Sequence, residues 1–151
     1  AHFSIDTLFN NLPSYTQAMD LIKQKGVEEE DKLVLQRQSI QKLYDAYTKD
    51  GANLPPAIKQ IKEEEIQKES QKLQEMQYEA QNNVEQYQMA LNQPILLRIR
   101  KASENVAKKL GVKYVLETQS TVYAGGKDIT KEILAETLKL EKEETSASTP
   151  K

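Results

Sequence analysis

The sequence predicts a mainly α-helical protein with a small β body: an α+β fold in which a long antiparallel helical hairpin projects from a short-stranded antiparallel sheet. Apolar residues follow helical spacing over two long segments, and a turn with two prolines separates these segments. Strand-forming residues cluster in one place near the C-terminal end. The 38% apolar content of the 151 residues is low for one compact core, which favours helices with narrow apolar stripes.

The chain opens with a predicted strand. Phe3 and Ile5 alternate around Ser4, which predicts a short strand followed by a turn within residues 1–12. Pro13 and Ser14 then begin a helix, because proline is tolerated in a first helical turn.

The first long helix is predicted from Ser14 to about Lys49. One seam position recurs every seven residues and is occupied by Met19, Gly26, Leu33, Ile40 and Tyr47. The neighbouring seam position is apolar at Ile22 and Leu43 but polar at Glu29 and Gln36. We therefore expect the middle of this helix to be weakly packed against its partner and able to bend.

Residues 50–56, DGANLPP, predict a turn, and the second helix is predicted from Ala57 to Leu110. So short a connection implies an antiparallel helical hairpin. Pro94 is expected to kink or locally break the second helix. Gly111 is expected to end it, as glycine commonly does after a helix.

The segment from Val112 to Leu134 predicts a strand pair with a turn at Gln119-Ser120, ended by Gly125-Gly126 and followed by a short helix. We expect residues 142–151 to be a disordered tail. The predicted organisation is a body of residues 1–13 and 94–141 and an arm of residues 14–93 with its tip at 50–56. Because such a body is small and leaves strand edges exposed, we expect a homo-oligomer.

The composition argues against several classes of protein. The net charge of −2 makes nucleic acid an unexpected partner. The chain has no cysteine, and its one histidine, His2, lies at the N-terminus, so no nucleophile and base can be assembled. Glu28-Glu29-Glu30-Asp31 and Glu63-Glu64-Glu65 point in different directions on a helix and are expected to be solvated rather than to bind a metal. Gly125-Gly126-Lys127 lacks the spacing of a phosphate loop.

We therefore expect no enzyme, no catalytic or metal-binding residue and no cofactor. No apolar run approaches the length of a transmembrane helix. The chain begins at Ala1 without a basic and apolar leader, so we expect either a processed, exported protein or a shortened chain.

Two stretches near the C-terminal end, YVLET and TVYAGGKDITKEIL, resemble the C-terminal signature of the Skp (OmpH-like) family of periplasmic chaperones. The strand near Phe3-Ser4-Ile5-Asp6, the helix start at Leu12-Pro13-Ser14-Tyr15 and Gln93-Pro94-Ile95 support the resemblance, which spans about residues 2–140. The last two details resemble Bacteroidetes-type members more than enterobacterial ones.

The resemblance implies a jellyfish-like homotrimer in the periplasm, with its signal peptide removed. It also implies an ATP-independent holdase that keeps unfolded outer-membrane proteins in a cavity between the arms. The residues expected at subunit contacts are Phe3, Ile5, Tyr114, Leu116, Val122 and Tyr123. The residues expected to touch clients are Met19, Leu33, Ile40, Tyr44, Tyr47 and Ile58.

The predicted arm departs from the family's basic arms. Residues 14–93 hold 10 Lys and Arg against 14 Asp and Glu, a net charge of −4, whereas residues 94–141 carry a net charge of +3. Electrostatic attraction of clients or lipopolysaccharide by the arms is therefore in doubt. A peripheral contact with a membrane surface stays open. Two other functions remain open as well: a structural coiled-coil adaptor that binds folded partners, and a prefoldin-like chaperone.

Overall fold

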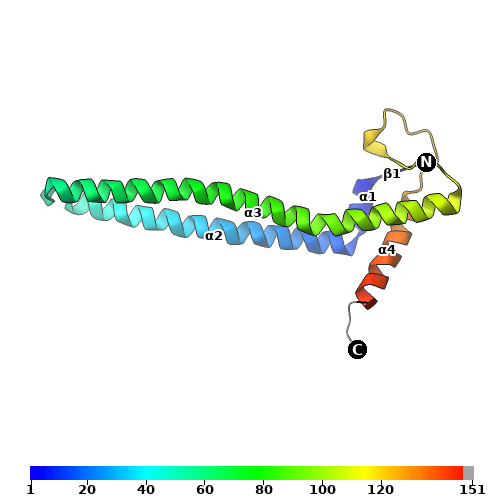
Figure 1. The fold of residues 1–151 in the computed structure, drawn as a ribbon, viewed down its shortest axis with the longest axis horizontal. Helices are drawn as coiled ribbons and strands as arrows, with labels where there is room; N and C mark the ends of the chain where they lie inside the picture. The colour runs from blue at the N-terminus through cyan, green and yellow to red at the C-terminus, as the bar shows by residue number, and fades with distance from the viewer. Residues whose placement is uncertain (148–151) are drawn as a thin grey trace. The chain divides into compact units, whose positions relative to one another are not determined.

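The computed structural model describes residues 1–147. Its elements in order are β1 (His2–Phe3), α1 (Ile5–Asn11), α2 (Pro13–Asp50), the 3-10 turn η1 (Gly51–Asn53), α3 (Pro56–Leu110), β2 (Leu116–Glu117), the 3-10 turn η2 (Thr118–Ser120) and α4 (Thr130–Ala147), as Figure 1 shows. The contacts divide the chain into two compact units. The hairpin unit is Ile22–Tyr87, and the terminal unit combines residues 1–21 with residues 88–147.

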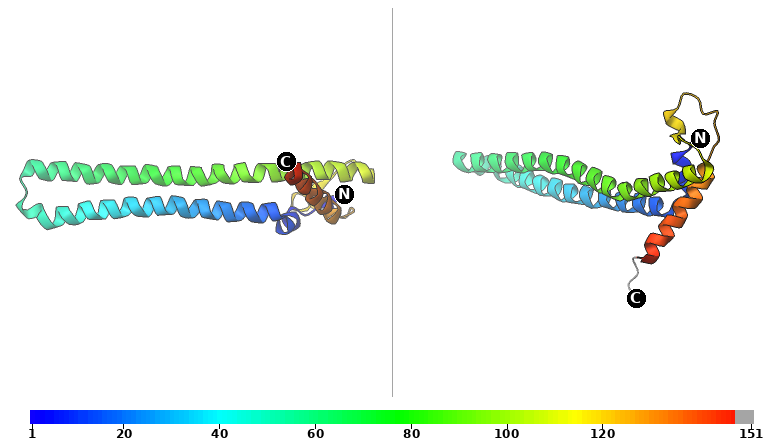
Figure 2. Two further views of the ribbon diagram at one scale, coloured as in Figure 1. Left: turned by 90° about the horizontal axis from the view of Figure 1, so that it is seen from below. Right: turned by 45° about the vertical axis from the view of Figure 1, so that its right-hand side comes forward.

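In the hairpin unit, α2 and α3 lie side by side and run in opposite directions (Figure 2). Leu54 has the extended backbone that a following proline requires, with φ −80° and ψ 142°. Pro56 is the first residue of α3, where its missing N–H costs nothing. The two long helices and the turn between them are confirmed within a few residues of the predicted bounds.

The terminal unit holds the main apolar core. Its buried residues are Leu8, Leu12, Ala18, Ile95, Ile99, Ala102, Val106, Ile129 and Ile133. The four on α3 follow the i, i+4, i+7, i+11 spacing of one helix face, which α1 and α4 cover. Phe9 stacks on Tyr15 at the edge of this core, with ring centroids 4.3 Å apart.

We expected Pro94 to kink or locally break the second helix; α3 is continuous through Pro94, so the break is wrong, and the kink stays a prediction. Proline removes one backbone hydrogen bond and crowds the preceding turn. Ile95, the next residue, and Ile99, one turn further along the helix, are buried in the core of the terminal unit. Burial of these side chains on one helix face offsets the lost hydrogen bond.

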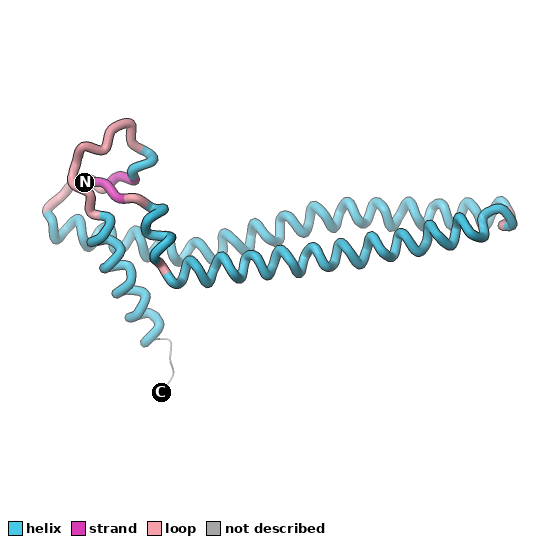
Figure 3. Tube along the Cα trace, turned by 180° about the vertical axis from the view of Figure 1, so that it is seen from behind, coloured by secondary structure: helices cyan, strands magenta, loops and turns pink. Residues whose placement is uncertain are grey.

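The sheet is parallel, so the predicted antiparallel sheet is wrong. His2 pairs with Leu116 and Phe3 with Glu117, and on its other side β1 bridges to Asp128, also in parallel. A parallel pair needs a long crossover between its strands, which α1, α2 and α3 provide. The two strands lie beside the loop that connects η2 to α4 (Figure 3).

The expected strand pair at Gln119-Ser120 does not form, because Glu117 closes a turn there instead. Its carboxylate accepts hydrogen bonds from the backbone N–H of Ser120 at 2.9 Å and from the Ser120 hydroxyl at 3.2 Å. The chain then turns through η2, where the Thr121 N–H donates to the Thr118 carbonyl at 3.2 Å.

Helix α4 begins at a hydrogen-bonded N-terminal cap and is longer than predicted. The Asp128 carboxylate accepts from the N–H and the hydroxyl of Thr130, at 2.9 and 2.6 Å, and so caps the helix. The Thr130 hydroxyl oxygen accepts from the Ser4 N–H at 3.0 Å. The helix continues to Ala147, so the predicted disordered tail is wrong for residues 142–147, and residues 148–151 lie outside the described residues.

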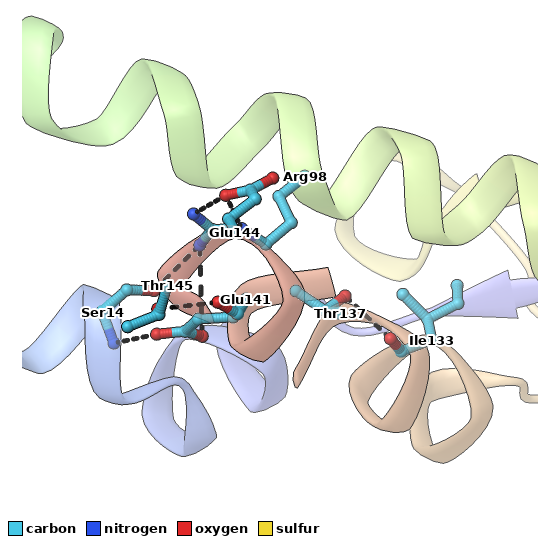
Figure 4. Close-up of polar contacts among 7 residues, drawn as sticks. All are labelled: Ser14, Arg98, Ile133, Thr137, Glu141, Glu144 and Thr145. Atoms are coloured by element: carbon cyan, nitrogen blue, oxygen red, sulfur yellow. Dashed lines mark hydrogen bonds and ion pairs between the residues drawn. The ribbon is translucent and has the colours of Figure 1, made fainter. Parts of the chain in front are cut away.

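An ion-pair cluster accounts for the extra length of α4. Arg98 on α3 donates to Glu144 at 3.0 Å through Nε and at 2.5 Å through Nη2 (Figure 4). Glu141 accepts from the Ser14 N–H at 3.1 Å and lies 4.0 Å from the Arg98 guanidinium. The sequence of residues 142–147 is polar, so its helix depends on these contacts with α2 and α3 rather than on apolar burial.

Candidate functional site

The residues predicted at subunit contacts fall into two groups in the terminal unit. Phe3 and Ile5 are half-buried, and Ile5 is the first residue of α1 rather than part of a strand. Tyr114, Leu116, Val122 and Tyr123 are exposed, and Val122 is fully exposed. These four lie on and around β2 and in the loop after η2, and we call them the β2 patch. Residues 114–123 therefore leave four large apolar side chains open to solvent in the single chain.

The residues predicted to touch clients differ in how exposed they are. Tyr44 and Ile58 of the hairpin unit and Met19 of the terminal unit are exposed, whereas Ile40 and Tyr47 are half-buried. The Tyr47 hydroxyl donates to the Glu63 carboxylate, which raises the pKa of Tyr47. Leu33 is only 6% exposed in the seam between the two helices. In the closed hairpin Leu33 is therefore a packing residue rather than a contact for another chain.

Sequence reasoning missed a different set of open apolar side chains in the hairpin unit. These are Val27, Val34, Leu35, Ile61 and Tyr78, all exposed. Val27 and Val34 are seven residues apart and offset from the seam, so a helical projection of the sequence could have placed them on the outer face of α2. We call these five residues, with Tyr44 and Ile58, the outer apolar set.

Charged side chains surround the outer apolar set. Glu30 pairs with Arg37 at 2.7 Å, and Lys25 lies 3.8 Å from Glu28. An open hollow of about 390 Å³ lies over α2 at Lys23, Gln24, Val27 and Glu28. Single apolar contacts separated by charges do not form a shaped pocket for a small molecule.

The seam of the hairpin unit contains buried charge. Glu29 accepts from the ammonium groups of Lys25 at 2.8 Å and Lys32 at 3.0 Å. These hydrogen bonds, that of Lys25 first, hold the pKa of Glu29 below its ordinary value, and Glu29 in turn raises the pKa of Lys25. Gln36 donates to the Glu69 carboxylate at 2.7 Å and lowers the pKa of that group.

Two further carboxylates hold α4 in the terminal unit. Glu136 accepts from the Asn105 amide at 2.8 Å and from the Lys109 ammonium at 3.0 Å, and these contacts lower its pKa. The Thr130 hydroxyl and N–H lower the pKa of Asp128. Each of these carboxylates therefore joins or caps a helix.

The described part of the chain offers no group of three His, Asp or Glu residues placed to hold a metal ion. Within residues 1–147, no helix combines the length and the apolar character that crossing a membrane requires. The exposed apolar side chains named above form two sets, the β2 patch in the terminal unit and the outer apolar set in the hairpin unit.

Comparison with known proteins agrees with this arrangement. The family model described as outer membrane protein (OmpH-like) matches residues 1–137. A crystal structure from Caulobacter crescentus CB15, described as an outer membrane chaperone (OmpH-like), has the same fold with a TM-score of 0.78 and 13% sequence identity. The match covers 91% of this chain and 82% of that one. No curated protein sequence matches the chain. With the family model covering most of its length, the chain belongs to the OmpH-like family of outer membrane proteins.

Proposed function

We propose that this chain is an ATP-independent holdase that binds unfolded outer-membrane proteins in the periplasm and prevents their aggregation. The observation that carries the proposal is the outer apolar set, whose members are spread singly over both helices of the hairpin unit between charged residues. Membership of the OmpH-like family and the shared fold with a protein described as an outer membrane chaperone support it.

The chemistry of the outer apolar set suits an unfolded chain. An unfolded β-barrel protein presents apolar side chains at short and irregular intervals, with no fixed shape. Several weak apolar contacts on one helical unit bind such a chain by multivalency, without selecting one sequence. A folded partner would instead need a continuous complementary surface.

The charge of the chain limits the electrostatic contribution to binding. Residues 14–93 carry a net charge of −4, so an acidic client is not attracted to this segment as a whole. Apolar contacts then supply most of the affinity, and added salt weakens binding little.

We further propose that three copies associate through the β2 patch. Tyr114, Val122 and Tyr123 leave large side chains open to solvent in a single chain, and contact with another copy would bury them. Association would place several hairpin units in one particle and so increase the number of contacts with one client.

The test is suppression of aggregation. An unfolded outer-membrane β-barrel protein is diluted from urea into buffer without nucleotide, and light scattering is recorded with increasing amounts of this protein. We expect suppression to be complete near one trimer per client. Aggregation that proceeds unchanged at excess protein would contradict the proposal, and binding of folded partners alone would indicate the adaptor function instead.

A further inference from the structure

The seam of the hairpin unit is polar over part of its length and apolar elsewhere. One seam row of α2 reads Ile22, Glu29, Gln36 and Leu43, so two polar residues interrupt an apolar heptad row. Both are buried, Glu29 at 6% and Gln36 at 9% exposed. We call Lys25–Gln36 of α2 and Glu69–Asn83 of α3 the polar layer.

The Glu29 carboxylate accepts hydrogen bonds only from side chains of its own helix, among the described residues. Its two partners, Lys25 and Lys32, both lie on α2. Over the described residues, no hydrogen bond or ion pair joins Glu29 to α3. The carboxylate therefore occupies the interface without attaching the two helices to each other, while its removal from water opposes packing.

The packing around Glu29 is incomplete. A pocket of about 110 Å³, open to solvent on one side, is lined by both helices, with Leu33 of α2 and Met76 and Ala80 of α3 among its walls. Glu79 and Asn83 line it from α3, and Lys32 lines it from α2. Side chains that face a pocket lack dispersion contacts on that side, so Leu33 and Met76 hold the helices together less than packed residues would.

One polar contact crosses the layer. The Gln36 amide donates to the Glu69 carboxylate at 2.7 Å and to the Glu69 carbonyl at 3.2 Å. These hydrogen bonds fix how α2 is aligned with α3, which is the best-attested role of a buried polar residue in a coiled coil. Their exchange for water is nearly neutral in free energy compared with the separation of packed apolar residues.

We propose that the two helices separate locally at the polar layer while α2 and α3 stay packed on either side of it, and that the separation presents Leu33 and Met76 to an apolar segment of an unfolded client. The second half of the proposal rests on the proposed holdase function. Leu33 is then covered in the free protein and becomes a contact when the seam opens. The opening is a property of the hairpin unit itself and can be measured without a client.

The test uses hydrogen–deuterium exchange of the full chain, read by mass spectrometry of overlapping peptides. In the wild-type protein we expect amides of the polar layer to exchange at least about tenfold faster than helical amides on either side of it in α2 and α3, because a helical segment that has lost its packing partner unfolds locally more readily. Uniform protection along both helices would overturn the proposal.

A double variant, Glu29→Leu with Gln36→Leu, restores the apolar row. We expect it to slow exchange in the polar layer by about tenfold or more. The matched control is Asp31→Leu with Gln38→Leu, which likewise replaces one carboxylate and one glutamine by leucine, also seven residues apart, at exposed positions of α2. The control is expected to leave exchange unchanged, and equal slowing in both variants would contradict a role for the seam.

The same proteins are then compared in the aggregation assay. We expect the two introduced leucine side chains to close the seam, so that the double variant needs at least about threefold more protein for equal suppression. If its exchange slows and its suppression equals that of the wild type, the client-binding half is wrong. If the wild type itself fails to suppress aggregation, the holdase function is wrong, while the exchange result still decides whether the seam opens.

Discussion

The contrast between Leu33 and Leu35 gives the sharpest test of how the hairpin unit is packed. The two residues have the same side chain and lie two positions apart on α2, but Leu33 is 6% exposed and Leu35 is 66% exposed. Changing each to Ala removes the same three carbons from opposite environments. The difference in stability between Leu33→Ala and Leu35→Ala therefore measures burial with little influence from local helix propensity.

The size of each stability loss follows from the buried fraction of the leucine side chain. Burying three methylene equivalents contributes roughly 2.4 kcal/mol to the free energy of unfolding. Because Leu33 is almost completely buried, nearly all of this contribution applies to it. The pocket next to Leu33 lets the site relax, so we expect a loss of about 2–3 kcal/mol in the free energy of unfolding, the low end for buried Leu→Ala changes. Leu35 buries about a third of its side chain, which bounds its loss at about 0.8 kcal/mol.

The assay is urea unfolding followed by far-ultraviolet circular dichroism, at one protein concentration for all variants because association shifts apparent stability. Equal losses for the two variants, or a larger loss for Leu35→Ala, would refute the packing described for the seam. In the aggregation assay Leu35→Ala is expected to weaken suppression while the protein stays folded, since Leu35 belongs to the outer apolar set.

Three further predictions concern the terminal unit. The lowered pKa of Asp128 contributes stability that is lost as the pH falls below about 3.8, so Asp128→Asn should flatten the fall of melting temperature with acid, and an unchanged slope would exclude this contribution. Tyr114→Asp should convert the proposed trimer to monomers by placing a charge in the β2 patch, and trimers that persist in light scattering would place the contact elsewhere. Arg98→Met should speed hydrogen exchange in the last turns of α4 by releasing Glu144, whereas Arg100→Met, at an exposed residue of the same helix, should not. Equal effects of the two changes would contradict the anchoring contact.

The long helices could be predicted from the sequence because their signals are local. Pro13 and Pro56 begin α2 and α3, and the heptad spacing continues along α2 up to the turn. The direction of the strands could not be predicted in this way. β1 pairs with β2 across more than a hundred residues, and the hydrogen bonds of Glu117 that prevent the expected strand pair depend on side-chain geometry.

The sequence predicts the types of residue in the candidate site better than it predicts their positions. Four of the six residues predicted at subunit contacts, which make up the β2 patch, are exposed in the single chain, and their burial by another copy stays a prediction. For the helices, the heptad pattern marks which residues face the partner helix, and that face is buried rather than open. The pattern therefore assigns Leu33 to the client surface although it lies in the seam, and it misses Leu35 and Tyr78.

The most direct test of the account is the mass in solution, measured by light scattering on a sizing column with and without an unfolded outer-membrane β-barrel protein. The account predicts a free particle of about three times the 17.2 kDa chain mass, and a complex heavier by the mass of one client. A free monomer that forms no complex with the client would contradict both the association through the β2 patch and the holdase function.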